Sequence, residues 1–276
     1  MGQLDELQYF GPYRLVRRLA DSTMAERWLA LHERALSSHV VHRFQPCPDK
    51  ASQRRVMGAI EQGLALSGPH LLPIELFSLS ISQRPCAVTP YTGNHEGLLT
   101  LADLLRAKGG QMAPPEAERA MLHILEAARF AQRAGAVHGE IGWHEVMVDR
   151  HGSCAIEFYG LARRLRSGAG FAGGGATEAR RDEVRSIVEM GYRLVTGLDP
   201  KEPRIPATRL VKRLDRAWDE FFEAGLDAAD GFASAADAIE ALPSSARHRE
   251  RQASASTVRV VLNRFRWAST SRPSNR

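Results

Sequence analysis

The sequence has 276 residues, of which 43% are hydrophobic and 25% are charged, and its formal net charge is +5. These values are ordinary for a globular protein with one large domain or two lobes and an ample core. The sequence shows no signal peptide and no apolar run as long as a membrane span, and its three cysteines are too few and too scattered for a disulfide framework or a zinc site. We therefore expect a cytoplasmic protein without a membrane partner.

The positive charge is concentrated at the C-terminus. Residues 244–276 contain eight arginines and one glutamate, a net charge of +7, so the other 243 residues together carry −2. The Ser-, Arg- and Ala-rich composition of this tail predicts disorder. A mildly acidic body with a basic tail is not typical of a nucleic-acid-binding domain, so we expect no nucleic-acid contact except through the tail.

The N-terminal half has several extended patterns and one helical pattern. Residues 1–10 are interpreted as a leader, and residues 50–66 place Val56 and Ile60 on one helical face. We predict a mainly antiparallel sheet with one helix over residues 13–91. The strand patterns are apolar or alternating runs at 11–19, 28–32, 40–44, 73–80 and 86–88.

The C-terminal half has mainly helical patterns, which predict a helical lobe. Pro114 begins a long helix in which Met121, Ile124 and Leu125 lie on one face. The glycine-rich stretch 168–175 lacks the Gly-Lys-Ser/Thr ending of a phosphate-binding loop and is predicted to be a flexible loop. Further helices are predicted at 98–107, 181–196, 210–226 and 232–242.

A polar loop and a β-hairpin follow the long helix. The loop begins at His138, and apolar runs at 146–148 and 154–158 predict two short strands. The turn between them, at 149–152, ends in Gly152, which supplies a positive φ. Helix, polar loop, hairpin and glycine follow one another in this order.

This layout resembles the catalytic centre of a protein kinase. The run from His138 to Glu145, His-Gly-Glu-Ile-Gly-Trp-His-Glu, is similar to the kinase motif His-Arg-Asp-Leu-Lys-x-x-Asn, and residues 158–160 fall on Asp-Phe-Gly. The resemblance is to bacterial serine/threonine protein kinases of the Hanks type. It implies an α+β, bilobal protein kinase-like fold, with a small antiparallel β lobe and one helix over 11–91 and a larger, mainly helical lobe over 92–243.

The chemical positions of these motifs have changed. Glu140 stands where the family has its base Asp, Gly142 where it has Lys, Glu145 where it has the metal-binding Asn, and Phe158 where it has the metal-binding Asp. The extra methylene of a Glu moves the carboxylate by about an ångström, and such a misplacement can cost about 10²-fold in rate. Glu157 could replace the lost Asp only if its strand slipped by one residue, which would turn every side chain to the opposite face. We expect no working catalytic residue and no metal site.

The phosphate-binding positions have changed as well. The glycines of the family's Gly-rich loop fall on Ala20, Ser22 and Ala25, and side chains there obstruct a close approach of the backbone to phosphate. Arg43 takes the position of the strand lysine, or His42 does if the register is one residue off. The alternative for Arg43 is a plain arginine on an edge strand.

Two further elements bear on nucleotide binding. The helical Glu that pairs with the strand lysine falls on Ala59, while Glu61 points elsewhere, so we expect that ion pair to be absent. The hinge falls on Thr89 to Tyr91, whose carbonyls could face an adenine, and Val41 shares the strand face of Arg43.

We expect weak or no ATP binding, without enhancement by Mg²⁺. The carboxylates of Glu140 and Glu145 would repel a triphosphate, whose phosphates would meet Arg43 and Arg27, the latter at a valine position of the family. The cleft is expected to be filled instead by the side chains of residues 158 and 159.

Two positions concern the buried framework of the large lobe. Glu183 takes the place of the Asp that begins a buried helix in the family. Gly231 replaces an Arg, and the Ala-Pro-Glu motif that would pair with it is absent, so both halves of one ion pair are lost together.

The resemblance implies a pseudokinase, a signalling or scaffold module that binds a protein partner. One alternative is an active or weakly active serine/threonine kinase that binds ATP and uses Glu140 as its base. A second alternative is association with nucleic acid through the Arg-rich tail. His138 to Glu140 also match half of a zinc-deaminase signature, but Cys86 lacks the second cysteine that the other half requires.

Overall fold

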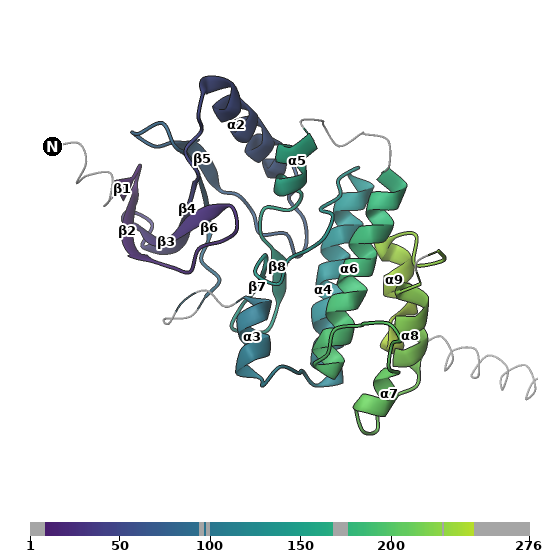
Figure 1. The fold of residues 1–276 in the computed structure, drawn as a ribbon. Helices are drawn as coiled ribbons and strands as arrows, with labels where there is room; N and C mark the ends of the chain where they lie inside the picture. Colours follow the sequence, from purple (N-terminus) through teal and green to yellow (C-terminus); the bar gives the residue numbers. More distant parts are fainter. Residues whose placement is uncertain (1–8, 94–96, 98–99, 168–175, 228, 246–276) are drawn as a thin grey trace, which may run out of the picture.

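The computed structural model describes residues 9–93, 97, 100–167, 176–227 and 229–245. They form two lobes, a curled sheet with one helix and a larger helical body (Figure 1). The expected loop at 168–175 and most of the leader and tail lie outside these residues. Among the described residues, no helix is both long and apolar enough to span a membrane.

The small lobe is built on a six-stranded sheet. Every neighbouring pair of strands is antiparallel, as predicted, in the order β1-β2-β3-β4-β6-β5. The edge strands are β1 and β5, so β4 lies inside the sheet and the edge-strand interpretation of Arg43 is wrong. The sheet also begins two residues before residue 11, the expected lobe boundary. The strands are β1 (Tyr9–Phe10), β2 (Tyr13–Arg18), β3 (Ala25–His32), β4 (Ser37–Phe44), β5 (Leu76–Leu79) and β6 (Pro85–Pro90).

The helix predicted at 50–66 is α2 (Lys50–Leu64). Asp49 begins it by accepting a hydrogen bond of 2.7 Å from a backbone N–H of the first turn. Ala59 and Ile60 are its buried residues, and they pack into a cluster where the two lobes meet. The helix therefore presents small and aliphatic side chains to the junction.

The large lobe contains a hairpin and seven helices among the described residues. The predicted hairpin is present and its register is regular, with Val146 opposite Ile156. Its elements are α3 (Leu101–Ala107), α4 (Pro114–Arg133), β7 (Val146–Val148), β8 (Cys154–Ile156), α5 (Leu161–Ser167), α6 (Ala176–Thr196), α7 (Ala207–Leu210), α8 (Ala217–Gly225) and α9 (Ala235–Ala241).

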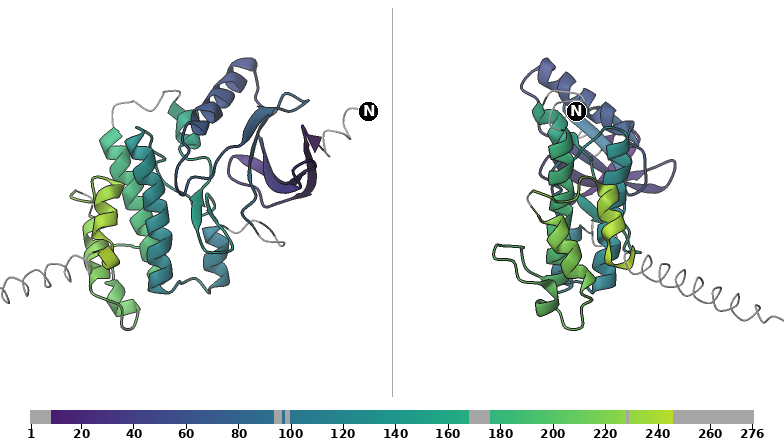
Figure 2. Two further views of the ribbon diagram at one scale, coloured as in Figure 1. Left: turned by 180° about the vertical axis from the view of Figure 1, so that it is seen from behind. Right: turned by 90° about the vertical axis from the view of Figure 1, so that its right-hand side faces the viewer.

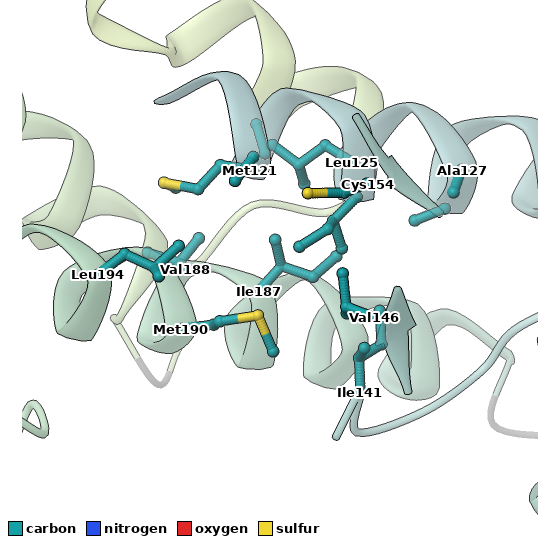
Figure 3. Packing of buried hydrophobic residues seen from close by; sticks show 14 of the residues in the cluster. Met121, Leu125, Ala127, Ile141, Val146, Cys154, Ile187, Val188, Met190 and Leu194 are labelled. Carbon is teal, nitrogen blue, oxygen red and sulfur yellow. The ribbon is translucent and has the colours of Figure 1, made fainter. Parts of the chain in front are cut away.

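The core of this lobe lies between α4, α6 and the hairpin (Figure 3). Met121 and Leu125 of α4 meet Ile187 and Val188 of α6, which confirms the apolar face predicted for α4. The two helices pack closely because Gly191 has no Cβ; a Cβ there would overlap the sulfur of Met121. This core fixes the hairpin and the polar loop above it.

Two helices differ from the prediction. Within the predicted segment 210–226 the helix α8 begins only at Ala217, because the chain turns after α7 ends at Leu210 and Arg213 has a φ of 60°. The helix α5 was not predicted at all. It lies beside α2 in two views of the molecule (Figure 2). Leu161 and Leu165 pack into the same apolar cluster as Ala59 and Ile60 of α2.

Candidate functional site

Two strands of the small lobe present charged or polar side chains to the junction with the large lobe. Arg27 on β3 and His42 on β4 are direct cross-strand neighbours, so their side chains share one face of the sheet. Both are buried, and both meet Glu157, which directly follows β8 in the large lobe. We call Arg27, His42, Glu157 and Phe158 the junction cluster.

An ion pair between Arg27 and Glu157 joins the lobes. Nη2 of Arg27 bonds to Oε2 of Glu157, and the two side chains are only 2% and 3% exposed. The same Nη2 also donates to the backbone carbonyl of His144 at 3.2 Å. Burial raises the pKa of Glu157, and the charge of Arg27 opposes that rise. One guanidinium thus ties β3 to two separate segments of the large lobe.

Glu157 reaches the junction without any slip of its strand, which corrects the expectation. The register of β7 and β8 is regular, but β8 ends at Ile156, and the backbone N–H of Glu157 donates to the carbonyl of Glu145 at 2.8 Å. Once the chain leaves the strand, the alternation of side chains between faces no longer applies. The carboxylate therefore points into the junction, where it is bonded to Arg27.

His42 lies behind the ion pair. Its Nε2 is 3.6 Å from Oε1 of Glu157 and 2.9 Å from Oγ1 of Thr89. Burial, and then the charge of Arg27, lowers the pKa of His42 well below its ordinary value, so the ring is neutral at neutral pH. A neutral imidazole cannot replace the charge of the family's strand lysine.

The ring of Phe158 fills the inner end of the junction. Its φ of 47° turns the chain sharply after β8. The ring lies edge-on to His42, with centroids 4.7 Å apart, and to Phe44, with centroids 5.3 Å apart. It also packs with Ala25, the first residue of β3, and with Ala59 of α2. An aromatic side chain therefore occupies the space between β3, β4 and α2.

Tyr159 points the other way, so the expectation that it fills the junction is wrong. Its hydroxyl donates to Oε1 of Glu183 at 2.5 Å, and its ring lies edge-on to His138 inside the large lobe. Glu183 also accepts from Nε2 of Gln132 at 2.8 Å and from the backbone N–H of His138 at 2.6 Å. Burial raises the pKa of Glu183 to about 7, and its hydrogen bonds oppose the rise. Glu183 thus anchors the polar loop from α6.

Glu145 stabilises the polar loop. Its Oε2 accepts from the backbone N–H of Gly142 at 2.7 Å and lies 3.9 Å from Nε2 of His138. A Cβ at position 142 would lie 3.0 Å from the same oxygen, so a lysine there would displace this carboxylate. The substitutions at 142 and 145 therefore fit each other.

Glu140 lies outside the junction cluster. It is exposed and lines a separate pocket of about 690 Å³ between the polar loop, α5 and α6. Charged side chains of both signs surround it, among them Arg163, Arg166 and Glu189. Burial, with a contribution from Glu140, raises the pKa of Glu189. The candidate base is thus separate from the residues that fill the junction.

The structure separates the predicted nucleotide-cleft positions. Thr89 contacts the junction cluster through His42, whereas Ala20 is exposed and Tyr91 donates its backbone N–H to Ser38 on β4 at 3.3 Å. Val41 packs with Phe10 on the opposite face of the sheet.

Arg43 lies on the same outer face as Val41 and lines a groove there. Of the two residues, His42, the alternative register, is therefore the one whose side chain faces the large lobe. In α2, Ala59 is buried at the junction while Glu61 is exposed, as predicted from the spacing.

The junction does not fit a magnesium nucleotide. Among the described residues, no group of three or more His, Cys, Asp or Glu side chains could hold a metal ion. Mg²⁺ requires oxygen ligands, and the carboxylates of Glu145 and Glu157 are already bonded to Gly142 and Arg27. The guanidinium that could meet a phosphate is likewise paired.

Arg27 has a role at the junction that was not predicted from the sequence. It was expected to meet a nucleotide's phosphates from a position where the family has valine. Its position at the start of the apolar run Trp28-Leu29-Ala30 was a usable signal, because an arginine in a buried strand requires a buried partner of opposite charge. The identity of that partner depends on the fold.

Comparisons with known proteins support the fold. No family model and no curated protein matches the sequence. The chain is similar in structure to a double mutant of the Mycobacterium tuberculosis PknI kinase domain, with a TM-score of 0.66 and 18% identity over 87% of this chain and 98% of that one. The PknI kinase domain without substitutions gives a TM-score of 0.64 and 17% identity over the same shares. The α+β, bilobal kinase-like fold predicted from the sequence is confirmed.

Proposed function

We propose that this chain is a pseudokinase, a kinase-like module that serves a signalling or scaffold role by binding a protein partner. The observation that carries the proposal is the buried ion pair between Arg27 and Glu157. With His42 and Phe158, it fills the place where a kinase would hold the phosphates of its nucleotide.

Electrostatics oppose nucleotide entry at this place. A triphosphate that approached Arg27 would also approach Glu157, which lies against the same guanidinium. Two like charges a few ångströms apart in a region of low dielectric repel strongly. The ring of Phe158 would also have to leave its apolar contacts with Ala25 and Phe44. Weak or no ATP binding follows from both effects.

Phosphoryl transfer depends on positioning and charge neutralisation, and the candidate residues supply neither. Glu140, the base of the alternative reading, lies in the separate charged pocket. Gly142 has no side chain to neutralise a transferring phosphate, and Glu145 is committed to the loop. Together these features favour a binding role over catalysis.

The two lobes are held together at several points, which suits a module with a constant surface. Besides the ion pair, the backbone N–H of Leu72 donates to Ile156 at 2.9 Å, and that of Ile156 donates to His70 at 2.8 Å. Helices α2 and α5 also pack side by side (Figure 1). A partner would therefore meet a surface that needs little ordering when it binds.

A phosphotransfer assay tests the proposal. The purified chain is incubated with radiolabelled ATP, Mg²⁺ or Mn²⁺, and generic protein substrates, beside the Glu140→Gln variant and a mock-purified sample. We expect equal background label in all three. Label on the chain or a substrate that disappears in Glu140→Gln and in the mock sample would establish the active-kinase alternative instead.

A further inference from the structure

An apolar groove lies on the small lobe, on the face of the sheet opposite α2. We call it the edge groove; its volume is about 500 Å³. Phe77 on β5 points to the α2 side, where it packs with Ala59 and Ile60, while its neighbours Leu76 and Ser78 line the groove. Ile81 at the rim is 75% exposed. The apolar lining comes from Tyr9, Phe10, Leu15, Leu76, Leu79, Ile81 and Cys86.

The groove lies between the two edges of the sheet. β1 and β5 each pair with one neighbour only, and both contribute to the lining. Alternate N–H and C=O groups of an edge strand point away from its single neighbour and are open to a further strand. β5, with four residues, offers the longer edge. The groove thus combines an apolar floor with backbone hydrogen-bonding groups.

One cation lies in this apolar lining. Arg43 of β4 is half-buried and lines the groove beside Ser78 and Ser80. Its cross-strand neighbour Glu26 gives its carboxylate to Arg84 instead, at 3.2 Å. Among the residues that the structure describes, no carboxylate lies within ion-pair distance of the Arg43 guanidinium. A single unneutralised cation in an apolar groove is complementary to an apolar ligand that carries one negative charge.

We propose that the edge groove binds an extended segment of a partner protein, which adds as a strand along β5. Its apolar side chains would fill the groove, and an Asp or Glu side chain would meet Arg43. Main-chain hydrogen bonds would give such a complex its affinity, and the groove and Arg43 would give it specificity. The tail at 244–276 is a poor occupant because its charge of +7 would be repelled by Arg43.

This inference is independent of nucleotide binding, because the groove and the junction cluster lie on opposite faces of the sheet. Peptide binding can therefore fail while the pseudokinase proposal stands. Conversely, a kinase with an active cleft could still carry a working edge groove. The experiment below addresses the groove alone.

Three fluorescein-labelled peptides test the proposal with the full chain. The first alternates valine and threonine around a central glutamate, the second has glutamine at that place, and the third has two prolines in the middle. Fluorescence anisotropy should show binding of the glutamate peptide, at least tenfold weaker binding of the glutamine peptide, and none of the proline peptide, because proline cannot donate a ladder hydrogen bond. Hydrogen exchange at Leu76–Leu79 should slow when the first peptide is bound.

Variants of the chain provide the matched control. Arg43→Gln should weaken the glutamate peptide at least tenfold and leave the glutamine peptide unchanged, whereas Arg54→Gln, an exposed arginine on α2, should change neither. Equal binding of all three peptides, or an equal effect of the two variants, would overturn the proposal. A dimer in sedimentation that Arg43→Gln dissociates would also overturn it, because a second copy of the chain would then be the occupant. So would binding of decanoate without binding of the peptides, because an aliphatic acid would then be the occupant.

Discussion

Arg27 and Glu157, separated by 130 positions in the sequence, form a buried ion pair that joins the small lobe to the large one. The pair lies among His42, Thr89 and Phe158, where the two lobes meet. The charge of Arg27, which stands on β3 where the kinase motif has valine, is thus neutralised by Glu157, a residue far away in the sequence. The four predictions below test this arrangement and its surroundings.

The ion pair should be strongly coupled in a double-mutant cycle. Arg27→Met alone or Glu157→Leu alone should lower the free energy of unfolding by about 3–5 kcal/mol, because each leaves a buried charge without its partner. The double variant should be less destabilised than either single one, since apolar side chains of similar volume replace both charges. Urea unfolding of the four proteins measures the coupling.

The matched control is the exposed ion pair between Arg216, which directly precedes α8, and Glu220 in the first turn of α8, whose charged atoms are 3.4 Å apart. Arg216→Met, Glu220→Leu and their combination should show coupling near zero, because solvent screens exposed charges. If the Arg27 cycle gave no more coupling than this control, the ion pair would not hold the junction.

Glu183 should make the protein less stable as pH rises toward 7. Its pKa in the folded chain is about 7, against about 4.3 for an unfolded glutamate, so the folded state holds the extra proton between these values. The stability that this proton contributes is fully present below pH 4 and is lost as pH rises through 7, by at most about 1.4 kcal/mol per pH unit. Glu183→Gln has no such proton, so its free energy of unfolding lacks this pH dependence. The amount by which the unchanged chain is more stable than Glu183→Gln should therefore shrink between pH 5 and pH 8.

Urea unfolding at several pH values measures this difference. Glu178→Gln, which changes an exposed glutamate on the same helix, is measured beside it as the control. A Glu183→Gln difference that stays constant or grows between pH 5 and pH 8 contradicts the assignment of a raised pKa to Glu183.

Any nucleic-acid binding should depend on the tail. Deletion of residues 246–276 keeps Ser244, whose backbone N–H donates to Glu118 at 2.6 Å, so the folded lobes are left intact. In a gel-shift assay, any DNA shift by the full chain should be lost on deletion and on raising the salt, because it comes from arginine–phosphate contacts alone. A shift by the shortened chain that persists at high salt would contradict this prediction, because it would place nucleic-acid contacts on the folded lobes.

The order of elements was predictable because it depends on local patterns. Helix periodicity located α4 and its buried Met121 and Leu125, and turn chemistry located the hairpin. The resemblance placed Glu183 on a buried helix, but its hydrogen bonds to His138 and Tyr159 were not predicted. Helix α5 was missed because seven residues with three arginines carry a weak apolar signal, and its packing against α2 stabilises it.

The junction was predictable only in part, since it depends on which face each strand residue takes. Val40, Val41, His42 and Arg43 show no clear alternation, so Arg43 and His42 were both open as the inward residue. The structure decides for His42, which contacts Glu157. The pairing of Arg27 with Glu157 could not be read from the sequence, because it depends on how two lobes meet.

Calorimetric titration of the full chain with ATP, with and without Mg²⁺, tests the central claim most directly. If the junction is closed by Arg27, Glu157 and Phe158, titration to millimolar ATP should give no binding heat in either condition, and Mg²⁺ should make no difference. Binding at micromolar ATP that requires Mg²⁺ would contradict the claim, since it would show that the junction opens to a metal–nucleotide complex.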